Sequence, residues 1–399
     1  MPKMLYISHA RFPTEKAHGL QIAQNCEAFA DAGYELELWV STRRNNHEMA
    51  AITDIHGYYG VKNNFTIKRI PSIDLYHLAG RHHRLEYIAF WVHVLTYSLM
   101  MLLYLLRQSA DIYYSRDRNA ILALSLIVPS HKLAFEVHQF ASTKQGSNAQ
   151  QAVTQRAGHI IAITPKLRDN FIEQYHASPE QVLLAHDGIR AARFTNMLDR
   201  QAAREKIGWD QSAFIVGYMG RLHTMGMDKG VGLAVNAAAT IEAISLALVG
   251  GPDDMAQQLE QQWLAKGGQA EHFLNAGTVT PDEIPIYLAA FDVCVMPFPW
   301  TEHYAYYMSP LKLFEYMASG AAILATDLPS VVDVVTHGET AYIVAPSNEQ
   351  ALHEGMIALQ QNDDLRATLA QNARITVLEK YTWSARANHI KAHLEREVV

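Results

Sequence analysis

Strand and helix signals alternate along almost the whole chain, and this alternation limits the possible folds more than any other feature. Residues 4–8 form a short apolar run typical of a buried strand, and residues 20–32 carry apolar side chains at helical spacing up to Gly33, where the helix is expected to end. The pattern repeats, with expected strands at residues 35–40, 112–114, 133–137 and 160–163. Repeated units of this kind form mainly parallel sheets with helices on both faces, so we expect a doubly wound α/β fold.

The pattern weakens between residues 186 and 210, where a turn-like segment precedes a charged stretch, and resumes with expected strands at 214–218, 246–250, 293–296 and 322–325. A chain of 399 residues is long enough for two hydrophobic cores. The sequence therefore predicts a first domain at 1–190, a linker at 191–210, a second domain at 211–380 and a last helical segment at 381–399. Open parallel sheets bind ligands at the carboxyl ends of their strands, so we expect the chemistry in a cleft between the domains.

The composition is that of a globular protein, with 49% hydrophobic and 18% charged residues, and the net charge of −7 gives no reason to expect a nucleic-acid partner. The two cysteines, Cys26 and Cys294, lie far apart, and the 20 His are scattered without a pair at ligand spacing. We therefore expect neither a disulfide framework nor a metal site. Met1 leads directly into the first expected strand, which leaves no room for a signal peptide and favours a cytoplasmic protein.

Residues 88–106 are almost entirely apolar, follow the segment Arg81-His82-His83-Arg84 and end before Arg107. This is close to the length that spans a bilayer. The favoured interpretation is a buried helix of the first domain whose polar side chains are satisfied inside. The second is a helix lying in the plane of a membrane, supported by the basic flanks and Trp91, which would make the protein peripheral on the inner face of the cytoplasmic membrane. A true span is least favoured, because it would place two strands of one domain on opposite sides of the bilayer.

Three segments carry the residue types expected of an anion-binding site. Gly19 opens the helix after the first strand, where a glycine lets a ligand approach the backbone; it is not part of a GxGxxG motif, which argues against a dinucleotide cofactor. In the second half, Arg221 follows a strand and Lys229 precedes the next helix, eight positions later. Two cations flanking a strand-to-helix loop suit a diphosphate, and the alternative is a solvated surface pair.

The third segment, residues 306–320, is the most informative. Ser309 is placed to cap a helix that starts at Pro310, so the amides of Leu311 and Lys312 are expected to point at an anion. Glu315 lies about one turn further along, where a carboxylate can accept two hydrogen bonds from the hydroxyl groups of a ribose. The alternative is a capping or surface glutamate.

Taken together, these pieces resemble the GT4-type retaining glycosyltransferases, which have the GT-B fold of two Rossmann-like domains facing each other across a cleft. The resemblance covers nearly the whole chain, and its specificity lies in the order and spacing of its parts. These are residues 12–19, the strand end at 135–138, Gly220-Arg221 with Lys229-Gly230, Val249-Gly250-Gly251, residues 309–320, residues 325–329 and Tyr381-Thr382-Trp383.

The resemblance implies a role for each matching position. Arg221 and Lys229 would bind the diphosphate of a nucleotide-sugar donor, together with the amides of Leu311 and Lys312. Glu315 would hold the ribose, and the backbone near Val279 would contact the base. His138 would lie beside the donor sugar, and Gly19 would let the acceptor-side loop approach the phosphates. The helix from Trp383 onward would cross back onto the first domain.

The chain departs from the family pattern at the donor sugar. The family often carries a Glu-x7-Glu pair, but the position eight residues before Glu315 is Tyr307. Sugar recognition is therefore expected to differ, with Glu302 and His303 as further candidates. Arg190 also stands where the family often has an acidic residue.

The resemblance implies transfer of a sugar with retention of anomeric configuration, by a hexosyltransferase-type enzyme of class EC 2.4 acting in cell-surface polysaccharide or glycolipid synthesis. Fixed cations can stabilise the departing diphosphate, so we expect no metal or other cofactor, with His138, Arg221 and Lys229 as the catalytic residues. The expected partners are a nucleotide-sugar donor and a glycan or lipid-linked acceptor. Two alternatives remain open at this point: a sugar-nucleotide epimerase of the same fold, and a non-catalytic nucleotide-sugar-binding protein.

Overall fold

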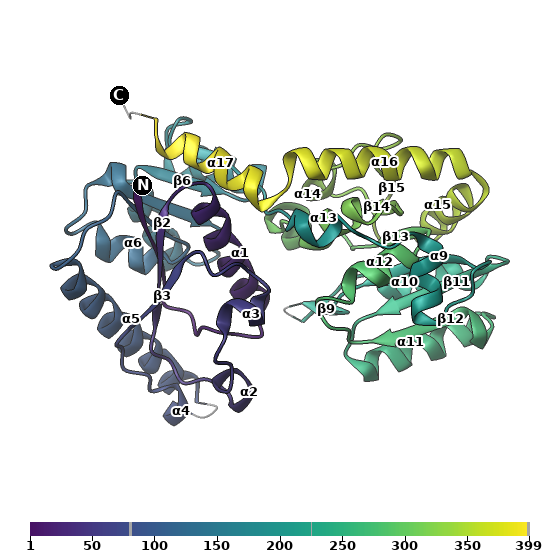
Figure 1. Ribbon diagram of the computed structural model, residues 1–399, viewed down its shortest axis with the longest axis horizontal. Coiled ribbons are helices and arrows are strands. Elements are labelled where there is room, and N and C mark those ends of the chain that lie inside the picture. The colour runs from purple at the N-terminus through teal and green to yellow at the C-terminus, as the bar shows by residue number, and fades with distance from the viewer. Residues whose placement is uncertain (80–81, 225, 397–399) are drawn as a thin grey trace. The chain divides into compact units, whose positions relative to one another are not determined.

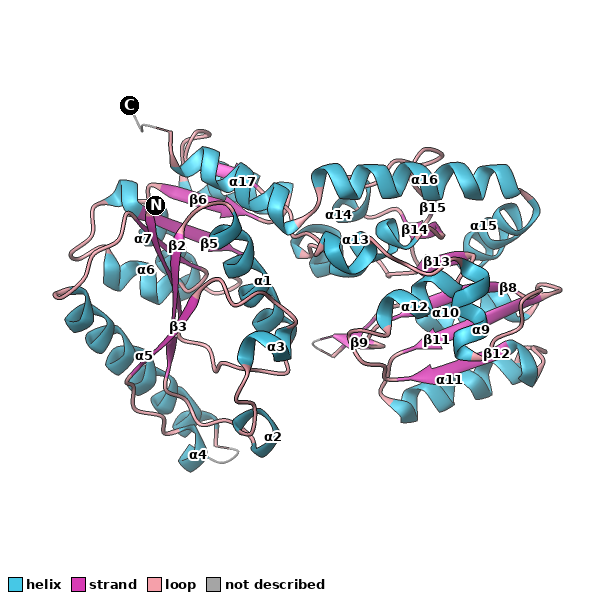
Figure 2. Ribbon diagram, viewed as in Figure 1, coloured by secondary structure: helices cyan, strands magenta, loops and turns pink. Residues whose placement is uncertain are grey.

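A computed structural model describes residues 1–79, 82–224 and 226–396 (Figure 1). The chain divides into two compact units, which we call the first and second domains: Met1–His186 with Trp383–Val399, and Asp187–Thr382. Each domain contains one parallel sheet with helices packed around it, as the colouring by secondary structure in Figure 2 shows. The expected α/β fold with two doubly wound sheets is confirmed.

The sheet of the first domain has seven parallel strands in the order β3-β2-β1-β4-β5-β6-β7. Its central strands are buried on both faces, which explains why their sequences are nearly continuous apolar runs. The strands are β1 (Lys3–Ser8), β2 (Glu35–Ser41), β3 (Thr66–Ile70), β4 (Ile112–Ser115), β5 (Leu133–Val137), β6 (His159–Ala162) and β7 (Val182–Leu184). The helices are α1 (Ala17–Asp31), α2 (His47–Ala50), α3 (Ile55–Tyr59), α4 (Tyr76–Ala79), α5 (His83–Leu105), α6 (Arg118–Leu124), α7 (Lys144–Thr154), α8 (Pro165–Tyr175) and α17 (Trp383–Leu394), with the 3₁₀ turn η1 (Ser130–Lys132).

The second domain has a six-stranded parallel sheet in the order β12-β11-β8-β13-β14-β15 and a small antiparallel pair, β9 with β10. The strands are β8 (Phe214–Met219), β9 (His223–Thr224), β10 (Met227–Asp228), β11 (Ile244–Val249), β12 (Phe273–Gly277), β13 (Val293–Met296), β14 (Ala322–Thr326) and β15 (Tyr342–Val344). The helices are α9 (Arg200–Ile207), α10 (Val231–Ala239), α11 (Asp253–Ala265), α12 (Ile284–Ala290), α13 (Leu311–Ser319), α14 (Pro329–Val332), α15 (Glu349–Gln361) and α16 (Asp363–Lys380). Three further turns are η2 (Ala191–Phe194), η3 (Ala270–His272) and the π-helical η4 (His303–Tyr307).

The last helix, α17, belongs to the first domain although the second domain precedes it in the chain. It packs along α1, and Ala387 and Ile390 are buried there. The first domain is therefore discontinuous in sequence, and its fold requires residues from both ends of the chain.

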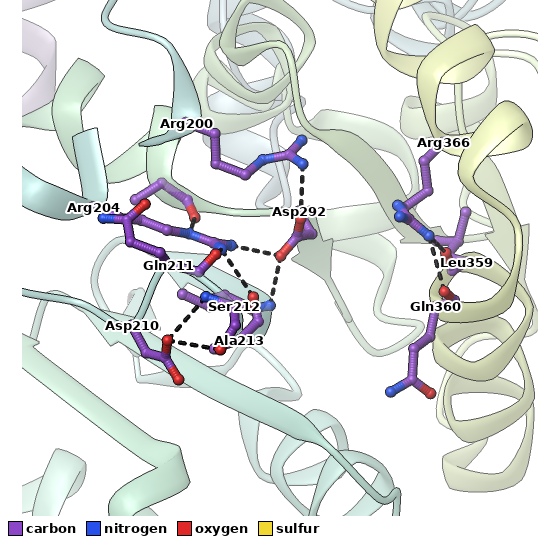
Figure 3. A network of polar contacts seen from close by, with 12 residues as sticks. Arg200, Arg204, Asp210, Gln211, Ser212, Ala213, Asp292, Leu359, Gln360 and Arg366 are labelled. Carbon is purple, nitrogen blue, oxygen red and sulfur yellow. Dashed lines mark hydrogen bonds and ion pairs between the residues drawn. The ribbon is translucent and has the colours of Figure 1, made fainter. Parts of the chain in front are cut away.

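The expected linker at residues 191–210 is instead part of the second domain. Arg204, on α9, is buried and donates hydrogen bonds to the carbonyl oxygens of Ala290, Gln211 and Ala213 (Figure 3). Its guanidinium also pairs with Asp292, at 2.6 Å. This buried ion pair fixes the segment to the second domain, so the segment is not a solvated connector.

Helix α5 contains residues 88–105 of the apolar segment and is half-buried. One face packs into the domain, where His93 Nε2 lies 3.2 Å from the carbonyl oxygen of His9 and the Tyr97 hydroxyl donates to the carbonyl oxygen of Trp39. The other face exposes apolar side chains at helical spacing: Leu85, Ile88, Leu95, Leu99 and Leu103. The interpretation as a helix buried on all sides is therefore wrong, because only the inward face meets the sheet.

By length and composition, α5 is the one helix among the described residues that could cross a membrane. It connects β3 to β4, however, and both strands belong to the same sheet. A bilayer crossing would separate them. Of the basic residues that flank α5, Arg84 and Arg107 are exposed, and Arg81 lies outside the described residues.

Candidate functional site

A pocket of about 580 Å³ lies at the carboxyl edge of the second domain's sheet, where the loops after β8, β11 and β12 meet. Pockets at this edge are where open α/β sheets bind ligands. Its volume is within the range of small-molecule sites. The lining residues are Met219, Gly220, Arg221, His223, Val249, Gly250, Gly251, Pro252, Thr278, Val279, Ile284 and Lys312.

Two glycines allow the loops around this pocket to approach closely. Gly250 has φ +138°, and a Cβ atom there would lie 2.1 Å from the carbonyl oxygen of Gly220. Gly230 has φ +73°, and a Cβ atom there would lie 2.1 Å from the carbonyl oxygen of Pro297. A larger residue at either position would strain the backbone and push the loops apart.

Two cationic side chains line the pocket, and a third lies near them. Arg221 and Lys312 line it, and Lys229 lies close enough for both to act on it electrostatically. Burial, and then the neighbouring charges of Lys312 and Arg221, lower the pKa of Lys229 to about 8. Like charges held together in this way are unfavourable, and Glu315, which pairs with Lys312, offsets only part of their charge, so the arrangement suits a ligand with several negative charges.

The first turn of α13 adds backbone donors to the cationic end of the pocket. The helix begins at Leu311 with Pro310 at the cap position, so the amides of Leu311 and Lys312 lie in the first turn, where they have no partner within the helix. Amides in this position stabilise anions. Ser309 does not cap the helix as expected, because its hydroxyl oxygen accepts a hydrogen bond from the backbone amide of Asp187.

Glu315 lies one turn into α13, and its carboxylate pairs with the Lys312 ammonium, with 2.6 Å between Oε2 and Nζ. The pair is only partly exposed. Glu315 is thus held beside the cationic end of the pocket. A single nucleotide would need its phosphate and ribose sites to be this close together. The ribose role stays a prediction.

Val279 lines the other end of the pocket with Thr278 and Ile284. These residues follow β12 or begin α12, and they are more apolar than the cationic end. This polarity difference suits a ligand with a charged part and a planar, less polar part, in agreement with the predicted base contact near Val279.

The three candidates for sugar recognition lie outside the described lining of this pocket. Glu302 precedes the π-helical turn η4, which contains His303 and Tyr307, and the Tyr307 hydroxyl lies 3.4 Å from Glu302 Oε1. Burial lowers the pKa of His303. The three therefore form one local group, on the loop between β13 and α13. Their role in sugar recognition stays a prediction.

Gly19 and His138 are in the first domain, each after the carboxyl end of a strand. A Cβ atom on Gly19 would lie 2.4 Å from the Tyr59 hydroxyl, which bonds to both the amide and the carbonyl oxygen of Thr14. Gly19 thus permits close packing of the loop between β1 and α1. His138 follows β5, and its Nε2 bonds to the buried carboxylate of Glu136.

Sequence reasoning missed three features of these sites. The ammonium of Lys312 is a further cation at the pocket, whereas only its backbone amide was expected to bind an anion. Lys312 stands three residues before Glu315, and this spacing could have indicated an ion pair on one helix face. Gly250 was noted only as part of a motif. Glu136 was also noted only as part of a motif. Its ion pair with Arg386, 250 residues away, was missed, because a contact of that range leaves no local signal in the sequence.

Residues 213–362 match the family model described as glycosyl transferases group 1. The chain is 24% identical over 246 residues to a D-inositol 3-phosphate glycosyltransferase from Streptomyces scabiei, covering 59% of this chain and 53% of the relative. It is 27% identical over 226 residues to the lipopolysaccharide core biosynthesis mannosyltransferase LpsB from Rhizobium meliloti, covering 54% and 61%. The matches thus span about half to three fifths of these relatives.

Solved structures extend the likeness in fold to the whole chain. Alr3699/HepE from Anabaena, solved in complex with UDP and glucose, has a TM-score of 0.70 at 16% identity and covers 99% of each chain. At this identity the likeness concerns the fold, and it includes both domains. The match to the glycosyl transferases group 1 model thus lies within the second domain, and the fold of the two domains is GT-B, as predicted.

Proposed function

We propose that this chain is a retaining glycosyltransferase that moves a sugar from a nucleoside-diphosphate donor to an acceptor. The observation that carries the proposal is the pair of cations Arg221 and Lys312 in one pocket, with Lys229 close to both and Glu315 paired with Lys312. The three cations and the α13 amides would hold the diphosphate, Glu315 the ribose and the Val279 end the base. The names of relatives and the complex of a structural neighbour with UDP and glucose support this choice of ligand.

The same cations would stabilise the departing group. In the transfer, the bond between the anomeric carbon and the diphosphate oxygen breaks, and an acceptor hydroxyl oxygen bonds to that carbon from the same face. The departing phosphate takes the hydroxyl proton. Negative charge accumulates on the diphosphate as the bond breaks, so positive charges fixed beside it lower the barrier. On this account His138 contacts the donor sugar, and no protein nucleophile is required.

Binding and turnover should be tested together. We expect at least one nucleoside diphosphate to raise the melting temperature of the protein in a thermal-shift screen, and its nucleotide-sugar to be transferred to an acceptor or slowly hydrolysed, as followed by mass spectrometry. An altered sugar released without an acceptor would indicate an epimerase instead. Binding without any turnover would indicate a non-catalytic binding protein.

We expect transfer to proceed without a divalent metal, because the cations occupy the place that a metal would take beside the diphosphate. Activity should be unchanged by EDTA and not increased by added magnesium or manganese. Activity abolished by EDTA and restored by either metal would overturn this expectation.

We also propose that α5 contacts an anionic membrane surface, so that a lipid-linked acceptor is presented to the enzyme there. Its exposed leucines and Ile88 follow one helical face, and Arg84 and Arg107 stand near its two ends. An apolar face flanked by basic side chains is typical of helices that lie in the membrane interface. Lipopolysaccharide in the name of LpsB agrees with a lipid-linked acceptor.

Flotation with vesicles containing phosphatidylglycerol tests this contact. The protein should float with these vesicles and much less with neutral ones, and the double variant Leu95→Glu, Leu99→Glu should lose binding. Leu264→Glu, at an exposed leucine of α11 in the second domain, is the matched control and should bind normally. Absence of flotation, or self-association through α5 in sedimentation experiments, would contradict the membrane proposal.

A further inference from the structure

A buried polar network connects α17, near the end of the chain, to His138. The Glu136 carboxylate accepts from Arg386 Nη2 at 2.9 Å, from Asn25 Nδ2 at 3.1 Å, and from the Tyr114 hydroxyl, all at Oε2. Its other oxygen, Oε1, bonds to His138 Nε2. Arg386 also donates to Asn25 Oδ1, at 2.9 Å, which closes a ring of three side chains.

The network is inaccessible to water except at His138. The side chains of Glu136 and Arg386 are each 2% exposed, whereas that of His138 is 16% exposed. The ion pair therefore lies inside the first domain, and the imidazole is the member that reaches the surface, at the carboxyl end of β5. A buried charged network of this kind is costly to assemble and rigid once complete.

The protonation of the network follows from its charges. Burial raises the pKa of Glu136, but Arg386, His138 and Arg116 lower it by more, so its pKa lies well below the usual range. Burial and then Glu136 raise the pKa of Tyr114 well above its usual range. Glu136 is therefore an ionised acceptor, and Nε2 of His138 must carry the proton that they share.

Several titratable side chains interact electrostatically with Glu136, and burial keeps the uncharged ones neutral. Burial and then Glu136 raise the pKa values of the Tyr6 hydroxyl and the Cys26 thiol, so both stay neutral. Arginine keeps its charge throughout. The groups are Tyr6, Cys26, Tyr114, Arg116, His138 and Arg386.

We infer that Glu136 and Arg386 are positioning residues, which set the ring orientation and the Nε2–H tautomer of His138 for the transfer reaction. The inference rests on the proposed function, in which His138 contacts the donor sugar. A histidine acts through both ring nitrogens, and the bond made by one decides what the other presents to a ligand. The last helix would then contribute to catalysis as well as to the fold, by delivering Arg386 to Glu136.

Nuclear magnetic resonance of the protein labelled with ¹⁵N in its histidines tests the geometry without any substrate. In the intact protein, Nε2 of His138 should carry the proton throughout the neutral range. In Glu136→Gln, the amide can donate to Nε2, so the population should shift toward the Nδ1–H tautomer. Arg386→Met should give a mixture. An unchanged tautomer in both variants would overturn the inference.

The second part of the test measures the kinetics of sugar transfer. Glu136→Gln should lower kcat by about ten- to a hundredfold, the scale of a misplaced catalytic group, while the donor KM changes far less. In a His138→Ala background the same substitution should have no further effect, because it acts through the imidazole. If Glu136 has a purely structural role, its substitution should lower kcat equally in both backgrounds, and that result would overturn the inference.

A matched control separates positioning from stability. Arg204→Met removes an equally buried arginine from the ion pair with Asp292 in the second domain. Arg204→Met should lower the melting temperature about as much as Arg386→Met does. It should leave the His138 tautomer unchanged and should not lower kcat selectively relative to the donor KM. If the intact protein shows no transfer or donor hydrolysis at all, the proposed function fails, while the tautomer measurement still decides the geometry.

Discussion

At the scale of single residues, the candidate pocket depends on charges that repel one another in the free protein. Lys229 is the most perturbed of them, because it is largely removed from water and lies beside two other cations. Such a cluster costs stability, and a ligand with several negative charges recovers that cost on binding.

The lowered pKa of Lys229 predicts that nucleoside diphosphate binding weakens at alkaline pH. In the proposed function, Lys229 binds the phosphates in its protonated form. As the pH rises through about 8 the free protein loses this proton, so binding must be accompanied by proton uptake. The dissociation constant should therefore increase above pH 8, by at most about tenfold per pH unit. Calorimetry between pH 7 and 9.5 measures this. Lys229→Arg is the control and should show little change, since arginine stays protonated; a constant affinity in the unmodified protein would contradict the assignment.

Glu315→Gln should weaken binding of the nucleoside diphosphate about ten- to a hundredfold, because a charge-assisted hydrogen bond to the ribose contributes roughly 1.5–3 kcal/mol. It should spare inorganic pyrophosphate, which has no ribose; the Lys312 ammonium, released from its pair with Glu315, stays available to phosphate. Calorimetry with both ligands checks this.

Arg221→Ala is the companion variant and should weaken both ligands, since Arg221 lines the cationic end of the pocket. Equal losses for the two ligands in Glu315→Gln would remove the ribose assignment. A large fall in its melting temperature would instead assign Glu315 a structural role.

At the scale of elements, the position of a helix in the fold is decided by a few long-range contacts. Helix α9 carries charged residues that resemble a connector in sequence, yet Arg204 anchors it to the strand end at Asp292. Helix α17 is joined to the first domain in the same way, by the pair of Arg386 with Glu136.

Arg204→Met should lower the free energy of unfolding of the second domain by about 3 kcal/mol, because it leaves the carboxylate of Asp292 buried with a weaker partner. The partners that remain are the backbone amide of Ile215 and the guanidinium of Arg200, whose side chain is 43% exposed. Arg200→Met is the matched control and should cost less than about 1 kcal/mol, as expected of an exposed pair. Urea unfolding of the three proteins compares these values, and similar costs for the two variants would contradict the assignment of Arg204 as the anchor.

At the scale of the whole molecule, the two domains differ in how the chain builds them. Residues 187–382 form the second domain without interruption, whereas the first domain needs α17 from the far end of the chain. Every described residue that lines the candidate pocket belongs to the second domain.

A fragment of residues 187–382 should therefore fold alone and bind a nucleoside diphosphate with an affinity within about tenfold of that of the full chain. A fragment of residues 1–186 should be much less stable, because it lacks Arg386 and leaves Glu136 as an unpaired buried charge. Circular dichroism and calorimetry of both fragments test this. Loss of nucleotide binding by a folded 187–382 fragment would show that the first domain contributes to the site.

The sequence by itself determined the class of fold and suggested several residues in and around the candidate pocket. Strands buried on both faces are largely apolar, so β1, β5, β8, β11 and β14 could be located from short apolar runs, and β2 from its alternation of Glu and Leu. Arg221, Lys229, Glu315 and the amide of Lys312 could be proposed because they stand at fixed distances from strand and helix ends, and those distances are local, whereas Val279 was proposed only from the family resemblance.

Only the tertiary structure decided which residues meet across the chain. The edge strand β3 is only partly buried and carries polar residues, and the edge strand β15 has only three residues, so neither shows the longer apolar run that marks the central strands. Whether α5 is buried or exposed depends on how much of its circumference the sheet covers, and an apolar composition is compatible with either. The pair of Glu136 with Arg386 joins residues 250 positions apart, and no periodicity or local spacing encodes a contact of that range.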